Sequence, residues 1–351
     1  MMTCSKEDPI KAIACFINIL LQPLVQCVIR SKTLPTGSEA IQAFEGYVKR
    51  GYLQPTTLFV TMHIHDLCTT LPHHLILEKL QEFLHTYAEN RQIEGTSTAT
   101  IVRLVQLILE NQFCVYENKL YQQTAGCSVH SSLIIALVDI YLFYLQHNLV
   151  SILTKKKELF GRSLNQLFFT WNGSKDELLT LLDRINLTNS TYTHIQITTS
   201  IDHNLQYLDA EIGHDEGLLY TRVYHDSNLE PYALPYVLET TASQSHLFLL
   251  RAALIRSILY CSNVVEFENE RLFIDLCFII NDISMNFIQK TYENFLIEFH
   301  LFRADTCMDE NTYQGLRQRI RQYHQRRTQY HLRQRQRRRR RRLHHIIPSN
   351  E

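Results

Sequence analysis

Apolar residues recur every three or four positions through the first fifty residues of the chain. This spacing predicts two helices, at residues 6–31 and 37–50. A different pattern follows at Thr57–Ile64 (TLFVTMHI), which is β-branched and apolar enough to be a buried strand. Pro72 then opens a long amphipathic stretch, HHLILEKLQEFLHTYAE, and another helix is predicted at Thr98–Glu110. The first 110 residues therefore combine helices with a single buried strand.

The rest of the chain is predicted to alternate hairpins and helices. Phe113–Tyr121 has the pattern of a hairpin turning at Glu117-Asn118, and Ser128–Leu149 is a long, mostly apolar stretch that predicts a helix. The further predicted elements are a hairpin of Leu159–Leu164 and Gln166–Thr170, a helix at Lys175–Ile185, strands at Thr193–Thr199, Leu205–Ile212 and Leu218–Tyr224, and helices between Ser243 and Phe302. This order predicts an α+β fold, in which an antiparallel sheet with packed helices is followed by a helical domain.

Charge is distributed unevenly along the chain. With 351 residues and 45% hydrophobic positions, the sequence can bury a core and form two packed lobes. The formal net charge is zero, but Arg317–Arg342 holds 13 of the 35 Lys and Arg residues and no acidic residue. Residues 1–316 therefore carry 22 basic and 34 acidic residues. An acidic body is followed by a polycationic tail.

Cysteine usage and hydropathy predict the compartment. Nine cysteines are scattered without a Cys-x-x-Cys pair, which is typical of reduced thiols, so we expect a nuclear or cytoplasmic protein. Lys11, Gln22 and Gln26 interrupt the apolar residues near the N-terminus. No stretch reaches the roughly 18 uninterrupted apolar residues of a membrane span, and we expect no membrane partner. The pattern predicts no particular oligomeric state.

Six segments occur in an order that resembles a known family. They are TTLFVTMHIHDLCTTLP, KLYQQTAGCSVHSSLIIALVDIYL, LFGRSLNQLFFTWNGSKDELLTLLDRIN, THIQITTSIDHNLQYLDAEI, LLYTRVYHDSNLEPYALPY and SHLFLLRAALIRSILYCSNVVEFENERLFI. In this order they resemble the motifs of Penelope-like retroelement reverse transcriptases, which are related to telomerase, over residues 6–300. The resemblance implies a degenerate and truncated copy, because that family's first fingers segments have no counterpart upstream.

The resemblance implies a division of the chain into four parts. Residual fingers helices are expected at 1–56, a palm-like reverse transcriptase domain at 57–240, and a helical thumb-like domain at 241–305. The palm is expected to be an antiparallel sheet with packed helices. Residues 306–351 form an Arg-rich tail, which is expected to be disordered because like charges repel.

The family's catalytic aspartates are replaced in this sequence. Polymerisation in the family uses two Mg²⁺ ions, held by one carboxylate from the first palm strand and two from the following hairpin. The matching positions hold His63, Asn165 and Gln166. Losing three negative charges beside two dications removes many kcal/mol of attraction, even at an effective dielectric constant of ~20. We therefore expect no bound metal cofactor and no RNA-directed DNA polymerase activity in this copy.

Two other sets of residues are candidates for nucleic-acid contact. By resemblance, the template-binding and primer-binding positions are Gln123, Gly126, Arg162, Leu208 and Asp209. From charge alone, the phosphate-binding residues of the tail are Arg333, Arg335, Arg337, Arg338, Arg339, Arg340, Arg341 and Arg342. This arginine run predicts RNA or DNA binding through the tail. The simpler alternative is a solvated charge run with no dedicated partner.

Three further interpretations are open at the level of sequence. The chain could be a domesticated, non-enzymatic protein that binds nucleic acid or serves as a scaffold, with the Arg-rich tail supplying the affinity. It could be an active polymerase that uses Asp66, Asp176 or Asp183 as metal ligands. His63 and His65 could share one face of a strand and hold a zinc or iron ion with Asp66, although drift at an unused catalytic position explains His63 more simply.

Overall fold

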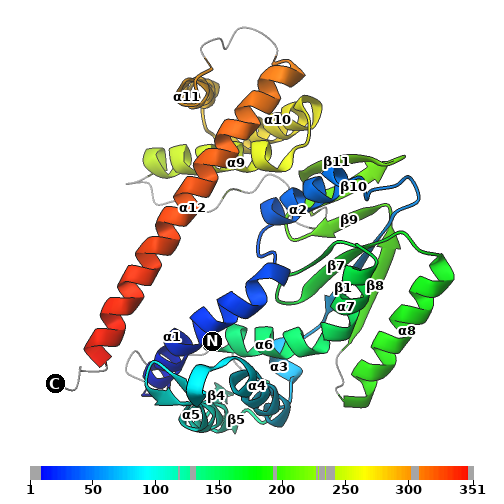
Figure 1. Cartoon of the computed structure of the whole chain (residues 1–351). Coiled ribbons are helices and arrows are strands. Elements are labelled where there is room, and N and C mark those ends of the chain that lie inside the picture. The colour runs from blue at the N-terminus through cyan, green and yellow to red at the C-terminus, as the bar shows by residue number, and fades with distance from the viewer. Residues whose placement is uncertain are drawn as a thin grey trace. The chain divides into compact units, whose positions relative to one another are not determined.

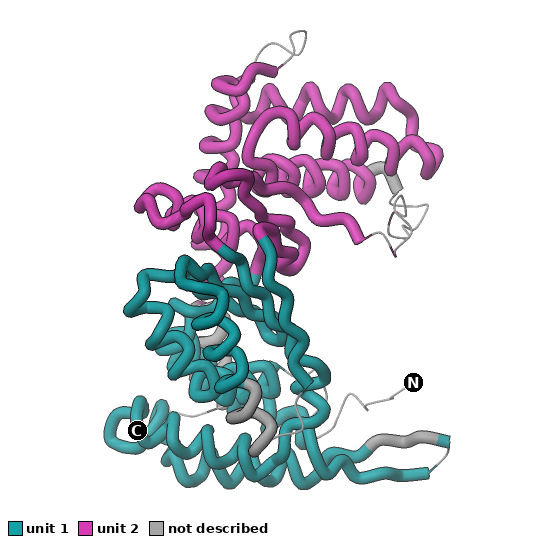
Figure 2. Tube along the Cα trace, turned by 90° about the vertical axis from the view of Figure 1, so that its right-hand side faces the viewer, with its two compact units in different colours: residues 1–35, 58–202 teal, residues 36–57, 203–351 magenta. Residues whose placement is uncertain are grey.

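The computed structural model describes residues 9–117, 119–126, 132–192, 196–226, 228, 234, 242–301 and 308–346 (Figure 1). The chain divides into two compact units (Figure 2). Unit 1 consists of residues 1–35 and 58–202, and unit 2 of residues 36–57 and 203–351. These units cut across the four parts expected from the family resemblance. That four-part division stays a prediction.

Unit 1 contains most of the predicted palm. Its helices are α1 (Pro9–Ile29), α3 (Leu67–Thr70), α4 (His73–Tyr87), α5 (Thr98–Glu110), α6 (Ser132–Leu145), α7 (His147–Lys155) and α8 (Lys175–Tyr192), with 3₁₀ turns at Arg30–Lys32 and Glu89–Arg91. Its strands are β1 (Leu58–Ile64), β2 (Gln92–Ile93), β3 (Thr96–Ser97), β4 (Phe113–Tyr116), β5 (Lys119–Gln122), β6 (Phe160–Arg162), β7 (Gln166–Trp171) and β8 (Ile197–Asp202). β2–β3 and β4–β5 are small hairpins.

The main sheet of unit 1 is antiparallel, with strand order β6-β7-β1-β8. Side chains alternate between its two faces. On one face, Met62 and Ile64 of β1 and Leu167 of β7 line a pocket together with residues of α6, α7 and α8. The other face carries His63, which therefore points away from those helices. The sheet thus has one face covered by α6, α7 and α8, and an opposite face on which the half-buried His63 lies beyond the buried Phe59 and Phe168.

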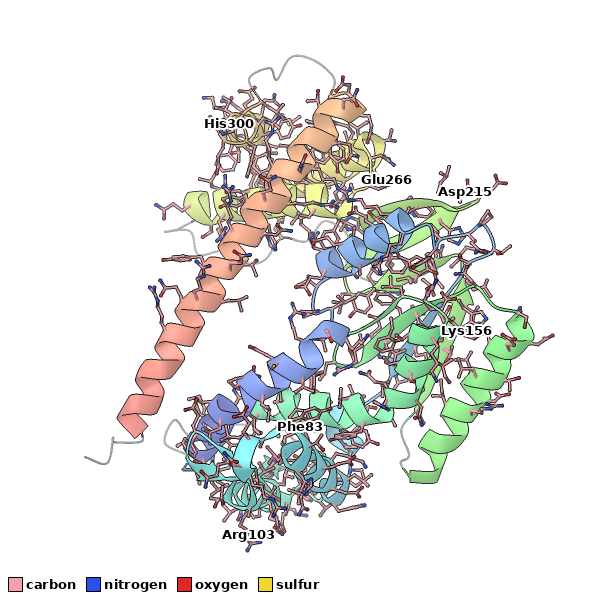
Figure 3. The ribbon with its side chains drawn as sticks, in the orientation of Figure 1. Phe83, Arg103, Lys156, Asp215, Glu266 and His300 are labelled. Atoms are coloured by element: carbon pink, nitrogen blue, oxygen red, sulfur yellow. The ribbon has the colours of Figure 1, made fainter. Side chains whose placement is uncertain are left out.

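A helical cluster completes the core of unit 1. α1 packs against α5 and α6, and α4 packs against α5 and α6. The apolar residues of these helices recur at helical spacing, so each helix presents one buried stripe to the cluster. Phe83 of α4 is fully buried there, while Arg103 of α5 lies on the outside (Figure 3).

α1 also bears on the expectation of no membrane partner. The segment Ile10–Lys32 is long and apolar enough to cross a membrane, judged by length and composition alone. Core helices of soluble proteins and signal sequences meet the same criterion. Here Ile17, Leu20 and Leu21 are buried, which accounts for one apolar face of the helix. The absence of a membrane partner stays a prediction.

Unit 2 is a small sheet with helices. It contains α2 (Gly37–Lys49), β9 (Asn204–Tyr207), β10 (Ala210–Asp215), β11 (Leu218–Val223), α9 (Ala242–Tyr260), α10 (Val264–Ile280), α11 (Met285–Glu298) and α12 (Glu310–Ile346). The sheet is antiparallel with order β11-β10-β9. α2 packs on β10 and β11, and α9 contacts β11, α10, α11 and α12. Gly37 opens α2 where an added Cβ would lie 2.8 Å from Ala210 and Tyr260, so only glycine fits this close packing.

The sequence pattern predicted the fold class correctly. A mixture of helices with antiparallel sheets is confirmed, and the helix Thr98–Glu110 has the predicted bounds. The strand predicted at Leu205–Ile212 is wrong as a single strand, because β9 and β10 form a hairpin whose two turn residues are Leu208 and Asp209. Leu208 has a φ of 54°, which is unusual for leucine, and no Gly or Asn signalled the turn.

Two other boundaries also differ from prediction. The helix expected at Ser128–Leu149 is two helices, α6 and α7, bent by 55° at Gln146. Residues 128–131 of that prediction lie outside the described part of the chain. No glycine or proline marks the break, so only the packing of the two helices reveals it. α8 extends beyond its predicted end at Ile185 to Tyr192, and β8 runs from Ile197 to Asp202. Residues 193–195 of the predicted strand Thr193–Thr199 lie outside the described part of the chain.

The prediction of a disordered tail is wrong for residues 310–346, which form the single helix α12. Arg and Gln are good helix formers, and no proline interrupts the segment. Tyr313, Leu316 and Ile320 recur at helical spacing and are fully buried in unit 2. This buried stripe anchors the first turns of α12, from which the arginine-rich part continues.

Candidate functional site

The β1–β7 pairing brings together the three positions at which the family resemblance places catalytic aspartates. His63 of β1 lies directly opposite Gln166 of β7. The carbonyl of Asn165 accepts a hydrogen bond from the Ile64 amide at 2.7 Å. Leu164 and Asn165 form the tight turn between β6 and β7, which the Ser163 amide closes by donating to the Gln166 carbonyl at 2.7 Å. The structure thus places the three predicted positions side by side at one end of the main sheet.

The side chains at this cluster are not those of a magnesium site. His63 and Gln166 are half-buried and Asn165 is exposed, so this end of the sheet presents an imidazole and two amides. Mg²⁺ prefers charged oxygen ligands, and none of the three residues supplies one. The residues present therefore do not fit the two magnesium ions of the family. Within the part of the chain that the structure describes, no group of three or more His, Cys, Asp or Glu residues is arranged to hold a metal ion.

The His63–His65 pair has partners of its own. The two rings meet edge to face with centroids 4.7 Å apart, and the His65 ring is in hydrogen-bond contact with the Thr198 hydroxyl of β8. Asp66 follows in a left-handed backbone conformation with a φ of 49°. Its carbonyl accepts hydrogen bonds from the hydroxyls of Thr69 and Thr70, each at 2.9 Å. This local packing accounts for both histidines without a zinc ion.

The two other carboxylates proposed for an active polymerase lie on the far side of the sheet. Leu181 and Ile185 of α8 line a pocket of about 650 Å³ together with Met62 of β1, so α8 covers the face opposite His63. Asp176 and Asp183 are exposed residues of that helix. They cannot join a metal site on the face that carries His63 without a rearrangement of the sheet.

Gln123 and Gly126 belong to unit 1 and have structural contacts. The Gln123 side chain donates to the Ala125 carbonyl at 3.0 Å. Gly126 has a φ of 65°, and its amide donates to the Leu71 carbonyl at 2.8 Å. An added Cβ there would lie 2.2 Å from the backbone of Thr69. Glycine is therefore required by close backbone packing beside α3, whatever its role in template contact.

Arg162, another predicted template contact, is a core residue of unit 1. Its side chain is only 1% exposed and forms an ion pair with Asp139 of α6, with an N–O distance of 2.6 Å. A second nitrogen donates to the Asp139 carbonyl at 3.2 Å. Burial, together with the charge of Asp139, also raises the pKa of the Cys68 thiol. Arg162 thus joins the sheet to α6 and has no surface with which to touch a template.

Leu208 and Asp209 lie in unit 2, at the turn between β9 and β10. Asp209 accepts a hydrogen bond from the Tyr260 hydroxyl at 2.8 Å, and Arg256 lies 3.9 Å from its other oxygen. Burial and then the Asp209 charge raise the pKa of Tyr260. The predicted primer contact is therefore a turn tied to α9. Six of the predicted positions thus lie in unit 1 and these two in unit 2.

α12 carries the arginine tail. Of the eight tail arginines, the structure describes the side chains of Arg333 and Arg337, and both are exposed. From His324 to Arg333 every residue of the helix is exposed. The N-terminal turns of the same helix are docked by Tyr313, whose hydroxyl donates to the Cys261 carbonyl at 2.9 Å. α12 therefore has a docked half and a solvent-exposed basic half.

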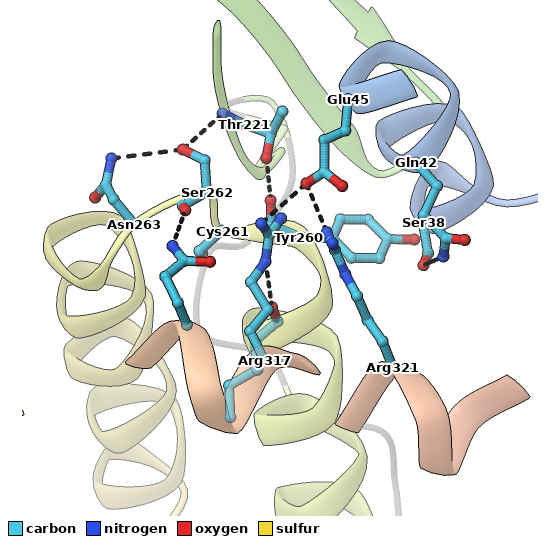
Figure 4. A network of polar contacts seen from close by, with 12 residues as sticks. Ser38, Gln42, Glu45, Thr221, Tyr260, Cys261, Ser262, Asn263, Arg317 and Arg321 are labelled. Atoms are coloured by element: carbon cyan, nitrogen blue, oxygen red, sulfur yellow. Dashed lines mark hydrogen bonds and ion pairs between the residues drawn. The ribbon is translucent and has the colours of Figure 1, made fainter. Parts of the chain in front are cut away.

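The docked half contains an ion cluster that the sequence analysis missed. Glu45 of α2 lies 2.9 Å from Arg317 and 2.6 Å from Arg321, and the Arg317 side chain is 6% exposed (Figure 4). Burial opposes ionisation of Glu45, but the two guanidiniums outweigh it and lower its pKa. Burial lowers the pKa of Arg317, whereas the charge of Glu45 raises it. The guanidinium nevertheless remains charged across the accessible pH range. By sequence, Arg317 and Arg321 belong to the arginine-rich segment Arg317–Arg342. The signal that separates them is their i, i+4 spacing beside an apolar stripe.

Solved structures of telomerase share this fold. The structure of telomerase from Candida albicans in complex with the TWJ fragment of telomeric RNA matches with a TM-score of 0.57 at 11% identity, and covers 84% of this chain and 50% of that one. Apo telomerase from Candida tropicalis matches with a TM-score of 0.54 at 14% identity, over 87% and 55%. The chain spans about half the length of these structures. No family model and no curated protein matches the sequence.

Proposed function

We propose that this chain is a reverse transcriptase domain protein derived from a Penelope-like retroelement, and that this copy has lost RNA-directed DNA synthesis. The observation that carries the proposal is the strand register that sets His63 opposite Gln166, with Asn165 beside them. These positions meet at one point of the sheet, as catalytic positions must, yet none is a carboxylate. The telomerase-like fold supports the polymerase ancestry. The chemistry of the side chains supports inactivity.

Electrostatics explain why the absence of the three carboxylates should prevent metal binding. Each pairing of unit charges 4 Å apart contributes about 4 kcal/mol at an effective dielectric constant near 20. Neutral amides and an imidazole offer no such attraction to a dication, and no carboxylate of α8 faces this side of the sheet. We therefore expect no metal cofactor at this site. The residues can still serve the fold, since the Asn165 carbonyl holds the β6–β7 turn against β1.

Primer extension tests the loss of activity. The purified chain is incubated with a primed RNA template in Mg²⁺ and, separately, in Mn²⁺, alongside the triple variant His63→Asp, Asn165→Asp, Gln166→Asp. We expect no incorporation by the unmodified chain. Activity in the triple variant would show that the polymerase fold is intact and disabled only at the metal site. As a matched control, Thr100→Asp adds a carboxylate to an exposed position of α5, which lies in the helical cluster and outside the main sheet. Incorporation by the unmodified chain would overturn the proposal.

The partner that we propose is RNA or DNA, bound through the basic half of α12. Arg333 and Arg337 are exposed on a helix that follows an acidic body, so the positive charge is concentrated in one segment. Such a segment binds phosphates by releasing counterions, without reading base sequence. The nucleus and the cytoplasm both contain this partner, and we propose one of them as the location.

Salt dependence tests the tail. Binding to a labelled RNA or DNA should weaken steeply as salt rises, and deletion of residues 333–351 should abolish it. The deletion begins at Arg333 because Arg317 and Arg321 hold the ion cluster of unit 2. Replacing Arg337–Arg342 by lysine should keep the salt slope, whereas replacing them by glutamine should reduce it. Binding that survives the deletion would place the affinity elsewhere.

The second candidate is a domesticated, non-enzymatic scaffold that uses the same tail. The observation in its favour is that Gly126, Arg162 and Asp209, all predicted to contact template or primer, are engaged in contacts that support the fold. A scaffold would stay inactive after the aspartates are restored and would still bind nucleic acid through α12. Primer extension by the triple variant therefore separates the two candidates.

A further inference from the structure

α10 has two opposite apolar faces, and only one of them is used by the fold. Phe267, Ile274 and Phe278 are buried in the core of unit 2. On the other side of the helix a second set of apolar residues is exposed. These are Val265, Leu272, Leu276 and Ile279, whose exposed fractions are 64%, 58%, 41% and 42%. A helix that is apolar on both sides normally has a neighbour on both sides.

The exposed residues follow a heptad rule. With the exposed Asn269 they form what we call the α10 stripe: Val265, Asn269, Leu272, Leu276 and Ile279. Their spacing alternates between four and three residues, which confines the stripe to about 80° of the helix circumference. Alternating steps of four and three are the a/d pattern of helices that pack side by side with another helix. In this pattern Val265, Leu272 and Ile279 are d positions, and Asn269 and Leu276 are a positions.

We propose that the α10 stripe is a dimer interface, which pairs in parallel and in register with the same stripe of a second copy of this chain. Asn269 determines the relative orientation of the two helices. In a parallel, in-register pair its amide meets the amide of the partner's own residue, so donor and acceptor satisfy each other. In an antiparallel pair with the same a/d packing, the amide would face an apolar residue and lose its hydrogen bonds.

The flanks of the stripe favour the same arrangement. Glu268 and Asp275 lie on one flank, whereas Phe273 and Ile280, one and two heptads after Glu266, lie on the other. Parallel helices set one flank against the opposite flank of the partner, so the acids meet apolar groups. Antiparallel helices would set acid against acid. Arg271 already pairs with Glu268 at 2.8 Å and with Asp275 at 3.6 Å, which lowers the remaining repulsion.

The stripe is short, and its length sets the expected affinity. Five layers bury less area than the roughly 1,200–2,000 Å² of a stable complex. Association should therefore be weak, with a Kd on the order of micromolar. Because the contact is mainly apolar, it should persist at salt concentrations that abolish nucleic-acid binding by α12. This difference separates dimerisation from bridging of two copies by RNA or DNA.

Sedimentation velocity of the nuclease-treated, full-length chain tests the interface. At high salt, we expect a monomer–dimer equilibrium across a micromolar concentration series. Leu276→Asp should give a monomer at all concentrations. Leu218→Asp is the matched control, because Leu218 of β11 is 77% exposed and lies outside the stripe, and it should leave the equilibrium unchanged. A chain that stays monomeric throughout, or a dimer indifferent to Leu276→Asp, would overturn the proposal.

Cross-linking tests the orientation. Under mild oxidation, Asn269→Cys should give a disulfide-linked dimer, because position 269 meets its own copy only in a parallel, in-register pair. The unmodified chain, with its nine native cysteines, is the control for other disulfides. Adding Leu276→Asp to Asn269→Cys should abolish the cross-link. A dimer in sedimentation that gives no cross-link at 269 would overturn the parallel arrangement. Far-UV circular dichroism confirms that each variant is folded.

Discussion

Two clusters of polar residues differ in charge. One lies at the ends of β1 and β7 in unit 1, and the other lies at the base of α12 in unit 2. Three family positions meet at the end of β1 and β7, and all three side chains are uncharged or weakly basic. At the base of α12, Glu45, Arg317 and Arg321 bring three formal charges together in a largely buried cluster. The first arrangement brings three positions together without a formal negative charge. The second keeps buried charges where they join α2 to α12.

The difference shows which charges the fold requires. A buried ion is costly unless it is paired, so removing one member of a buried cluster penalises folding directly. A surface carboxylate at a metal site repels its neighbours when no metal is bound, so its loss costs the apo fold nothing. Structural charges are therefore expected to persist in this chain, and catalytic charges are not.

The largest effect is expected from breaking the cluster of unit 2. Glu45→Ala would leave two guanidiniums without their carboxylate and should destabilise unit 2 by about 3 to 5 kcal/mol. Denaturant unfolding measures this loss, and hydrogen exchange in α12 localises it. Lys49→Ala, at an exposed position of the same helix, is the control and should change little. A loss below about 1 kcal/mol would contradict a structural role for the cluster.

In unit 1, a comparable loss of stability is expected at a position where close backbone packing requires glycine. Gly126→Ala adds a Cβ 2.2 Å from the Thr69 backbone at a φ of 65°, so overpacking and backbone strain combine. We expect a loss of about 3 kcal/mol in unit 1 stability. Thermal unfolding of the variant measures it. Gly95→Ala, also in unit 1, serves as a control, because its φ of 78° carries the same backbone strain while nothing lies within 4 Å of the added Cβ.

Acid should weaken unit 2 through Glu45. The folded pKa of Glu45 lies below its ordinary value of 4.5, so its contribution to stability is present above that value and is lost as the pH falls through the folded pKa. We expect protection of α12 from hydrogen exchange to decrease below pH 4.5. Glu45→Gln should flatten this dependence. An unchanged pH profile in that variant would assign the acid sensitivity to other carboxylates.

The smallest effect is expected from restoring charge to unit 1. In the triple variant His63→Asp, Asn165→Asp, Gln166→Asp, two carboxylates lie directly opposite each other and a third is adjacent. Without a metal ion we expect a loss of about 1 kcal/mol at neutral pH. Mg²⁺ should recover it, which thermal unfolding with and without a chelator measures. An equal stabilisation of Thr100→Asp by Mg²⁺ would show nonspecific binding, because Thr100 lies in α5 and outside the sheet.

The sequence by itself determined what local pattern can encode. The spacing of apolar residues fixed the helix Thr98–Glu110 and the strand near Thr57–Ile64. It also showed that the chain ends in a polycation and that His63, Asn165 and Gln166 are not carboxylates. These features depend on neighbouring residues or on the identity of single side chains, which are visible without a fold.

Only the tertiary structure decided which residues meet. His63 and Gln166 are about a hundred positions apart, and strand pairing alone sets them face to face. The burial of Arg162 and Arg317 likewise depends on α6 and α2, which lie elsewhere in the sequence, so the same residue type that is solvated at Arg333 supports the core at those two sites. An arginine has no intrinsic preference that separates these outcomes. Its environment, created by long-range packing, supplies the difference.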